Sequence, residues 1–464
     1  MTSTEPSRFT GHDLIRIGIP KGPSLGTALT LLQAGQTTLE TLQAVLADPA
    51  AYLNDAVHDR LAWELNSSAR TEAARKRDQL QETRPYPVWG RALIEQGAFD
   101  QMDIAMQLPI TRAGAVMPDA HPGYGLPIGG VLGTLNAVIP WAVGVDIGCS
   151  VHLSVFDLPY LPGTAERLDL MGVLRRQMYF GMGQPVGMKE NHAVLDDPLW
   201  KDAEHIVRTL KDRAHAQIGT SGSGNHFGDF GVFSAPGQPD RLALLTHSGS
   251  RGFGAKIAAH YSKLAETLHP HLAPEARRLA WLDLGSEAGD QYWRAMTLAG
   301  RYARANHELI HARITSALGV QATLQVSNTH NLAWKETHGG ETLIVHRKGA
   351  TPAGAGVAGI IPGSLADSAM LVEGLGHPGS LSSASHGAGR RMGRMAAKRE
   401  LATRPEEVQA YLDAHGVQVS GASLDEHPLA YKRIEEVMAE QQDLVRITGR
   451  FTPKVVRMDD GDDD

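Results

Sequence analysis

Residues 137–150, AVIPWAVGVDIGCS, are an apolar run that leads into a loop containing Asp146 and Cys149. The pattern returns at 242–252 (LALLTHSGSRG) and 342–351 (TLIVHRKGAT), where apolar residues precede histidine, serine, glycine and basic residues. Short apolar runs bounded by such loops are typical of buried β-strands that hold functional loops. We therefore predict strands at 137–145, 242–245 and 342–345 within a sheet-based α/β (α+β) catalytic domain.

Helical patterns flank this region and set the expected boundaries: a mostly helical extension over 1–100, the catalytic domain over 101–458, and an acidic, disordered tail over 459–464. Three helices carry recognisable end signals. They are a helix at 39–46 after the capping-box sequence TTLE at 37–40, a helix at 301–318 ending at Gly319, and a helix after TRPE at 403–406 that ends near Gly416.

Composition and charge limit the class of protein. The chain has 464 residues, 42% of them hydrophobic, and a net charge of −7, to which the acidic tail contributes most. A near-neutral body can still carry a basic groove, so charge does not exclude a nucleic-acid partner. The single cysteine excludes an intrachain disulfide, and no signal peptide or bilayer-spanning run is present. We expect a soluble, cytoplasmic protein without membrane contact.

Several loops offer metal ligands. Asp146 and Cys149, three residues apart among glycines, can bind a divalent metal, and a deprotonated sulfur can bridge two ions. For this pair alone, a buried free cysteine beside a capping aspartate is the favoured alternative. Three histidines from other predicted strand ends, His226, His247 and His330, reverse that preference. Together the five side chains predict a two-metal site.

Two further motifs indicate phosphate binding. HRKGAT at 346–351 and SHGAGRR at 385–391 combine cations with small residues, so that backbone amides and guanidinium groups can approach phosphate oxygens. Neither is a Walker loop, and each could by itself be a solvated basic turn. The second motif contains His386, and an imidazole nitrogen can attack phosphorus to form a phosphoramidate.

In combination, the motifs resemble the series found in the RtcB family of RNA ligases. In chain order they are PDAHPGYG (118–125), VGVDIGCS (143–150), GTSGSGNHF (219–227), THSGSRG (246–252), THN (329–331), HRKGAT (346–351), PGS (362–364) and SHGAGRRM (385–392). The resemblance is strong over about 110–395 and looser over 426–445. It does not extend to the first hundred residues.

The resemblance implies a site with two Mn²⁺ ions and GTP. Asp146, Cys149 and His226 would hold one ion, and Cys149, His247 and His330 the other. His386 would be the guanylylated nucleophile. The nucleotide-binding set would be Asn225, Phe227, Asp229, Ser364, Ala388, Gly389 and Tyr431, and the candidates for RNA or triphosphate oxygens are Arg251, Arg347, Lys348, Arg390 and Arg394.

The activity implied by the resemblance is the joining of an RNA 3′-phosphate or 2′,3′-cyclic phosphate to a 5′-hydroxyl, through a histidine-GMP and a guanylylated RNA end. Expected partners are GTP, RNA such as tRNA halves or stress-cleaved RNA, and an archease-like activator. Asp229 stands where the family usually has glutamate, and the chain continues into an acidic tail where the family usually ends in Lys-Gly. Two alternatives remain: an RNA-end binder that has lost nucleotide transfer, and a metallophosphoesterase for cyclic phosphates.

Overall fold

The computed structural model describes residues 9–181, 190–202 and 205–459. The tail predicted at 459–464 lies outside these residues except for Asp459. The chain forms two compact units, residues 1–79 and 80–464, and each is treated by itself. No helix in the described ranges is long and apolar enough to cross a membrane.

The first unit is helical. It contains α1 (Gly11–Arg16), α2 (Pro23–Gln33), α3 (Leu39–Ala47) and α4 (Asp59–Arg77). Their apolar faces bury one small core that includes Leu14, Leu42 and Leu61. The predicted capping box was one residue out of place: α3 is capped by Thr38, whose hydroxyl accepts from the Thr41 amide at 3.1 Å, and Glu40 lies in the first turn.

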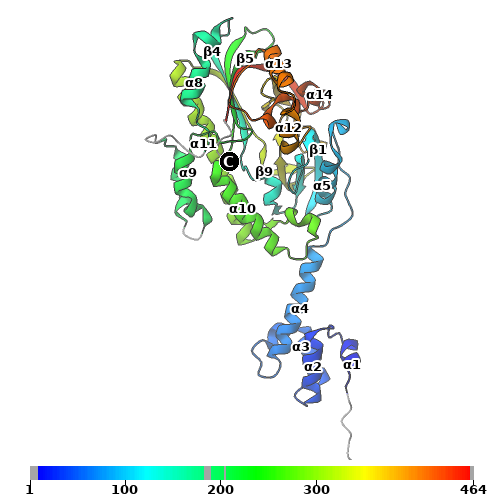
Figure 1. Ribbon diagram of the computed structural model, residues 1–464. Helices are drawn as coiled ribbons and strands as arrows, with labels where there is room; N and C mark the ends of the chain where they lie inside the picture. Colours follow the sequence, from blue (N-terminus) through cyan, green and yellow to red (C-terminus); the bar gives the residue numbers. More distant parts are fainter. Residues whose placement is uncertain (1–8, 182–189, 203–204, 460–464) are drawn as a thin grey trace, which may run out of the picture. The chain divides into compact units, whose positions relative to one another are not determined.

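The second unit combines two large, mainly antiparallel sheets with helices, which confirms the α/β (α+β) prediction. Its helices are α5 (Gln96–Met106), α6 (Pro140–Val143), α7 (Thr164–Arg167), α8 (Leu170–Gln177), α9 (Lys211–Gln217), α10 (Arg251–Leu268), α11 (Glu287–Leu318), α12 (Arg394–Leu401), α13 (Pro405–His415) and α14 (Ile434–Ala439). Figure 1 labels most of them along the chain.

The strands of the second unit are β1 (Thr111–His121), β2 (Ile128–Thr134), β3 (Ala137–Val138), β4 (Ser150–Pro159), β5 (Phe227–Ser234), β6 (Arg241–Ser248), β7 (Leu282–Asp283), β8 (Ala322–Thr329), β9 (Asn331–His338), β10 (Glu341–Lys348), β11 (Ala350–Pro352), β12 (Ala358–Ile361), β13 (Ala369–Gly374), β14 (Ser383–Ser385), β15 (Gln418–Ser420) and β16 (Val445–Met458).

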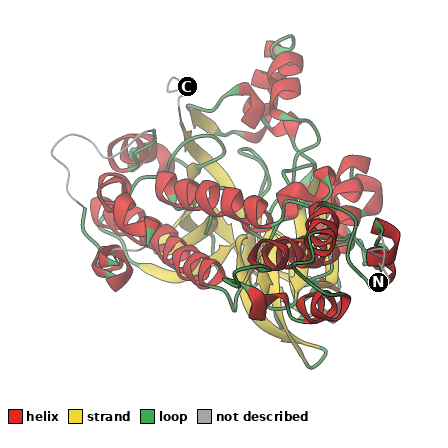
Figure 2. Ribbon diagram, turned by 90° about the horizontal axis from the view of Figure 1, so that it is seen from below, coloured by secondary structure: helices red, strands yellow, loops and turns green. Residues whose placement is uncertain are grey.

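The chain passes directly from one large sheet to the other at a single residue. One sheet has the order β12-β13-β16-β5-β6-β4-β8, with β15 beside β16, and the other has the order β1-β2-β10-β9. His330 alone separates β8 from β9, so it lies where the chain passes from the first sheet into the second. Figure 2 shows the yellow strands at the centre with red helices around them.

Helix α11 supports the first sheet. Its apolar residues Ile310 and Ile314 pack into the same core as Phe230 on β5 and Leu244 on β6. It also contacts α10, which follows β6. The helix begins at Glu287, earlier than the predicted 301, and ends as predicted at Gly319, whose φ of 64° suits a glycine C-cap.

Two other predictions need correction. The run 137–145 is not one strand, because Pro140 starts the short helix α6 directly after β3 and cannot donate to a strand ladder. As a result, Asp146 and Cys149 precede β4 instead of ending a strand. At 403–406 the helix-capping position is Arg404 instead of Thr403, although Pro405 in the first turn and Gly416 at the end occur as predicted.

Gly148 should be irreplaceable in the loop before Cys149. Its φ is +78°, and an added Cβ would lie 2.7 Å from the Cα of Gly300 on α11. Gly148→Ala should therefore destabilise the protein by about 2 kcal/mol or more, from backbone strain and overpacking together. Gly163 also has φ +78° but nothing within 4 Å of its Cβ position. Chemical denaturation should show a smaller loss for Gly163→Ala, and equal losses would contradict the close contact.

Candidate functional site

Strand register gathers the predicted metal ligands at one end of the first sheet. Phe227 on β5 pairs with His247 on β6, so His226 lies beside His247. His247 in turn pairs with Val151 on β4, two residues after Cys149. Ser150 pairs with Thr329 on β8, which brings Cys149 beside His330. Residues almost two hundred positions apart in sequence therefore converge.

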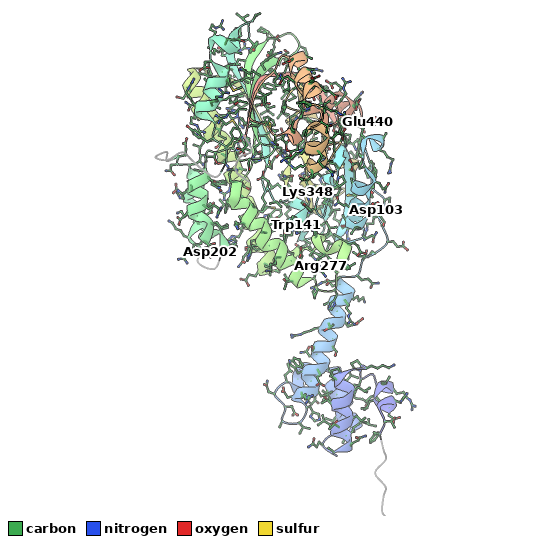
Figure 3. All side chains as sticks on the ribbon, viewed as in Figure 1. Asp103, Trp141, Asp202, Arg277, Lys348 and Glu440 are labelled. Atoms are coloured by element: carbon green, nitrogen blue, oxygen red, sulfur yellow. The ribbon has the colours of Figure 1, made fainter. Side chains whose placement is uncertain are left out.

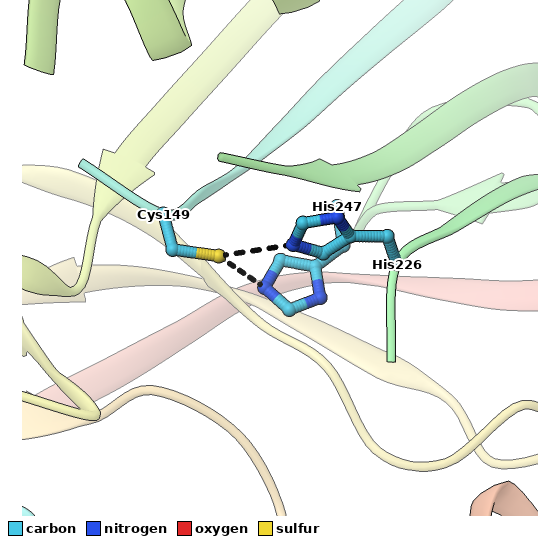
Figure 4. A group of neighbouring side chains, drawn as sticks. All are labelled: Cys149, His226 and His247. Carbon is cyan, nitrogen blue, oxygen red and sulfur yellow. Dashed lines mark hydrogen bonds between the residues drawn. The ribbon is translucent and has the colours of Figure 1, made fainter. Parts of the chain in front are cut away.

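The side chains make direct contact. The Cys149 Sγ lies 3.1 Å from His247 Nε2 and 3.5 Å from His226 Nε2, as Figure 4 shows. An Asp146 carboxylate oxygen lies 3.0 Å from His226 Nε2. His247 Nε2 and His330 Nε2 are 3.2 Å apart. All five predicted ligands thus form one connected cluster with the sulfur at its centre.

Backbone carbonyls orient two of the imidazoles. His226 Nδ1 donates to the Ser221 carbonyl at 2.6 Å, and His247 Nδ1 donates to the Asn225 carbonyl at 2.9 Å. A carbonyl oxygen only accepts, so in each neutral ring the proton is on Nδ1 and the Nε2 lone pair faces the cluster. This second interaction, which fixes the tautomer, is what metal-binding histidines usually have.

Burial favours the ligand form of the histidines. It lowers the pKa of His247 to about 3, with a further contribution from His226. It also lowers the pKa of His330 well below its usual value, and the Nδ1 of His330 has no hydrogen-bond partner among the described residues. Both rings are therefore neutral at physiological pH and have lone pairs available for a cation.

The two remaining ligands respond in opposite ways to this environment. Burial acts to raise the pKa of Asp146, but the combined interactions with His226, Cys149 and His247 outweigh it and the pKa lies below the usual range. Burial and the nearby Asp146 carboxylate raise the pKa of the Cys149 thiol well above its usual value. A bound cation would remove that penalty by stabilising the thiolate. The donor set therefore fits a metal centre.

Gly249 lets Asp146 reach this position. An added Cβ at Gly249 would lie 2.1 Å from an Asp146 carboxylate oxygen. The same oxygen accepts a hydrogen bond from the Ser250 amide at 3.2 Å, at the start of α10. The glycine in the motif THSGSRG thus provides the space in which the carboxylate is held.

His386 lies next to the cluster and is held by a residue that sequence reasoning missed. Its ring centroid is 4.9 Å from that of His330. Its Nδ1 lies 2.7 Å from a carboxylate oxygen of Asp119, which also accepts from the His386 amide at 3.1 Å. Asp119 is fully buried at the end of β1. It stands in the quoted motif PDAHPGYG, and its place in that motif was the signal available in the sequence.

Close backbone packing fixes the His386 loop. Gly389, with φ +72°, has its Cβ position 2.0 Å from the Asp119 carbonyl, so no side chain fits there. Ala388 beside it is buried. Gly349, which follows β10, has its Cβ position 3.1 Å from the His386 Cε1. Small residues in both phosphate motifs therefore let these loops approach one another closely.

The other residues predicted for the nucleotide fall into two groups. Phe227 has its ring 5.6 Å from that of His247, and the exposed Asn225 directly precedes His226. Asp229 is buried on β5 with one carboxylate oxygen unpartnered, and burial raises its pKa well above the usual value. In contrast, Ser364 bonds Asp367 at 2.5 Å and Tyr431 bonds Glu426. No hydrogen bond between described residues links these two to the metal cluster.

Most of the predicted phosphate-binding cations have protein partners. Arg251 donates to Thr220 at 3.1 Å and to the Gly181 carbonyl. Arg390 and Arg394 both pair with Glu426, at 3.0 and 2.6 Å. Lys348 donates to the Tyr124 carbonyl, and burial, with Arg278 nearby, lowers its pKa to about 7. Arg394 is half exposed and keeps a surface for a ligand.

Arg347 is the least accessible of the predicted cations. It is 1% exposed, and its guanidinium pairs with both oxygens of Glu336 at 2.7 and 3.0 Å. It also donates to Ser383 at 2.8 Å and lies over the Trp334 ring. These contacts hold the guanidinium in the protein interior and give no support to a phosphate-binding role. Side chains on β10 alternate between its two faces, so Arg347 points to the face opposite that of its neighbours His346 and Lys348.

Arg347→Lys should therefore destabilise the fold. A lysine ammonium cannot reproduce the forked pairing with Glu336 and the bond to Ser383, so we expect a loss of about 2 kcal/mol. Arg446→Lys, in the exposed pair with Glu373 at 2.9 Å, is the control and should change stability little. Urea denaturation measures both. Unchanged stability with weakened phosphate binding would instead assign Arg347 to the ligand.

Comparison with known proteins identifies the family of this chain. The family model described as tRNA-splicing ligase RtcB matches residues 101–459. The RNA-splicing ligase RtcB of Escherichia coli K12 is 34% identical over 398 residues, covering 79% of this chain and 95% of that protein. The RNA-splicing ligase RtcB of Mycobacterium tuberculosis is 32% identical over 426 residues (76% and 98%), and the tRNA-splicing ligase RtcB of Nanoarchaeum equitans 30% over 441 (76% and 90%). The resemblance noted in the motifs is confirmed: the chain belongs to the RtcB family.

Proposed function

We propose that this chain is a GTP- and Mn²⁺-dependent RNA ligase that joins a 3′-phosphate or 2′,3′-cyclic phosphate end to a 5′-hydroxyl end. The observation that carries the proposal is the position of His386, whose Nδ1 bonds Asp119 while its ring lies against His330 of the metal cluster. A nucleophile held beside ligands for cations is what transfer of a nucleotidyl group requires.

In the first step, His386 Nε2 attacks the α-phosphorus of GTP. A P–N bond forms and the bond to pyrophosphate breaks. Asp119 holds the ring by its Nδ1 proton, so Nε2 is the free nitrogen, and it stabilises the positive charge that develops on the imidazole. Asp119 is thus a positioning residue for the nucleophile.

In the second step, an oxygen of the RNA 3′-phosphate attacks the phosphorus of the histidine-GMP, and the P–N bond breaks. The RNA end now carries GMP as a leaving group. In the third step, the 5′-hydroxyl attacks the 3′-phosphorus, GMP departs, and a 3′-5′ phosphodiester remains. Metal ions held by the Cys149 cluster would neutralise charge on the phosphate oxygens.

The identity of the metal rests on the family resemblance. Ligand softness alone favours zinc for a set of one cysteine and three histidines. Manganese is proposed because the motif series is that of the RtcB family. Two ions are proposed because the cluster divides naturally at Cys149, with Asp146 and His226 on one side and His247 and His330 on the other.

Guanosine is the proposed base because the motif series is that of the RtcB family, and Asp229 is the residue proposed to contact it. A buried carboxyl with an unpartnered oxygen can accept hydrogen bonds from the N–H groups of a guanine edge, and adenine offers no equivalent pair. Proposed partners are therefore GTP and RNA with the two end types, such as tRNA halves, together with an archease-like activator. A cytoplasmic location is proposed because the single cysteine fits a reducing compartment.

Removal of Cys149 tests the bridging role. Cys149→Ala should bind less than half the Mn²⁺ of the wild type, because the sulfur contacts ligands on both sides of the cluster. The fold should persist, since the loop is held by its own backbone contacts. Metal content after dialysis is the measurement, with Ser150→Ala as the neighbouring control. Full metal occupancy in Cys149→Ala would rule out the bridge.

Removal of His386 tests the ligase proposal and separates it from both alternatives. His386→Ala should retain its metals, form no GMP adduct with α-labelled GTP, and fail to join ordinary RNA ends. It should still seal RNA that already carries a 3′-terminal guanylate, because the third step does not need the histidine. His415→Ala, an exposed histidine on α13, is the control.

Three results would reject parts of this proposal. Wild-type labelling of His386→Ala would exclude His386 as the nucleophile. A wild-type protein that binds RNA ends but never joins them would be a non-ligating binder. Opening of cyclic phosphates without joining would identify a metallophosphoesterase.

A further inference from the structure

Tyr124 is an exposed aromatic residue on a loop beside the site. It lies between β1 and β2 in the motif PDAHPGYG, and its side chain has no role in the mechanism above. The residue is 59% exposed. It is the only Phe, Trp or Tyr among the described residues of the second unit that is largely exposed to solvent, so this exposure needs an explanation.

The Tyr124 loop is held rigidly on both sides. The Gln101 side chain clamps Gly123, donating to its carbonyl at 2.6 Å and accepting from its amide at 2.9 Å. The buried Lys348 donates to the Tyr124 carbonyl. Gly125, with φ +74°, packs so closely that an added Cβ would lie 3.0 Å from the Arg278 carbonyl. The backbone is fixed while the ring remains exposed, which is the arrangement of a preformed binding surface.

A cation and a second ring accompany Tyr124. The Arg278 guanidinium lies 4.7 Å from the centre of the Tyr124 ring and 5.8 Å from that of Trp141. The two rings are 6.0 Å apart. Arg278 is exposed, and none of the ion pairs found among the described residues involves it. Figure 3 labels Trp141 and Lys348 of this region, and Arg277, the neighbour of Arg278 in sequence.

This group adjoins the proposed catalytic centre. The Lys348 side chain that binds the Tyr124 backbone also passes 3.8 Å from the Cβ position of Gly144, two residues before Asp146. The next residue, Gly349, has its Cβ position 3.1 Å from His386 Cε1. Lys348 therefore connects the loop of Tyr124 with both the metal ligands and the nucleophile.

We propose that Tyr124, with Arg278 and Trp141, forms a stacking platform for an unpaired nucleobase of the RNA whose end is joined. An exposed aromatic face beside an unpaired guanidinium is the chemistry by which proteins hold single-stranded nucleic acid, with the base on the ring and the cation near phosphate. The platform orients the end nucleotide toward the metal cluster. This inference rests on the proposed function and specifies how its substrate is held.

The test measures RNA affinity of the full chain by fluorescence anisotropy in the presence of Mn²⁺. One oligoribonucleotide carries a 5′-hydroxyl without a 3′-phosphate, and the other carries a 3′-phosphate with a blocked 5′ end. Tyr124→Ala should weaken binding of at least one of them by about 5- to 100-fold, the usual effect of losing one stacked base. The oligonucleotide that is affected identifies the strand on the platform.

Two control variants test whether the loss of RNA affinity comes from the aromatic face of Tyr124. Tyr124→Phe keeps the ring face and should bind like the wild type. Trp63→Ala removes the other strongly exposed aromatic residue of the described chain, in the first unit, and should also bind like the wild type. Arg278→Gln should reduce the slope of log affinity against log salt by about 0.7, the loss of one phosphate contact on a single strand.

The inference is overturned if Tyr124→Ala binds both oligonucleotides as tightly as the wild type, or if Tyr124→Phe loses as much as Tyr124→Ala. Labelling with α-labelled GTP without RNA separates this result from the proposed function. A wild type that is not labelled, with RNA binding still dependent on Tyr124, contradicts only the proposed function. A labelled wild type whose RNA binding ignores Tyr124 contradicts only the platform.

Discussion

The convergence of the Cys149 thiol with the Nε2 atoms of His226 and His247 is the interaction on which the rest of the site depends. The Ser221 and Asn225 carbonyls fix both Nδ1 protons, so the Nε2 lone pairs face a buried sulfur. Without a cation this arrangement leaves electron-rich atoms in contact and a thiol that is costly to ionise. A metal ion bound here would convert the same contacts into ligation.

The fold supplies this convergence through strand register and through the junction of two sheets. The adjacent strands β5, β6, β4 and β8 each have one proposed ligand in or next to a terminal position, and the chain crosses to the second sheet at His330. The second sheet contributes Asp119 from β1, which binds His386. The proposed metal ligands lie along the first sheet, whereas His386 follows β14 of a two-stranded sheet and is held by Asp119, so their relative position depends on how these sheets pack.

Sequence analysis predicted that the five proposed metal ligands would share one site, because apolar runs and glycines beside most of them indicate loops at strand ends. It failed where local pattern and tertiary packing disagree. Pro140 divides an apolar run into a strand and a helix. Arg347 lies in a motif whose composition is typical of phosphate binding, but its guanidinium pairs with Glu336, eleven residues earlier on the neighbouring strand. Asp119 was missed because only tertiary structure brings it to His386, 267 residues later.

The central claim is that His386 carries the guanylate. Two lysines near the site are the chemical rivals, because burial lowers the pKa of Lys348 to about 7 and that of Lys432 to about 8, and a neutral amine can also attack phosphorus. Peptide mapping by mass spectrometry after incubation with Mn²⁺ and GTP distinguishes them. The account predicts an acid-labile, base-stable GMP on His386, and GMP on Lys348 or Lys432 would contradict it.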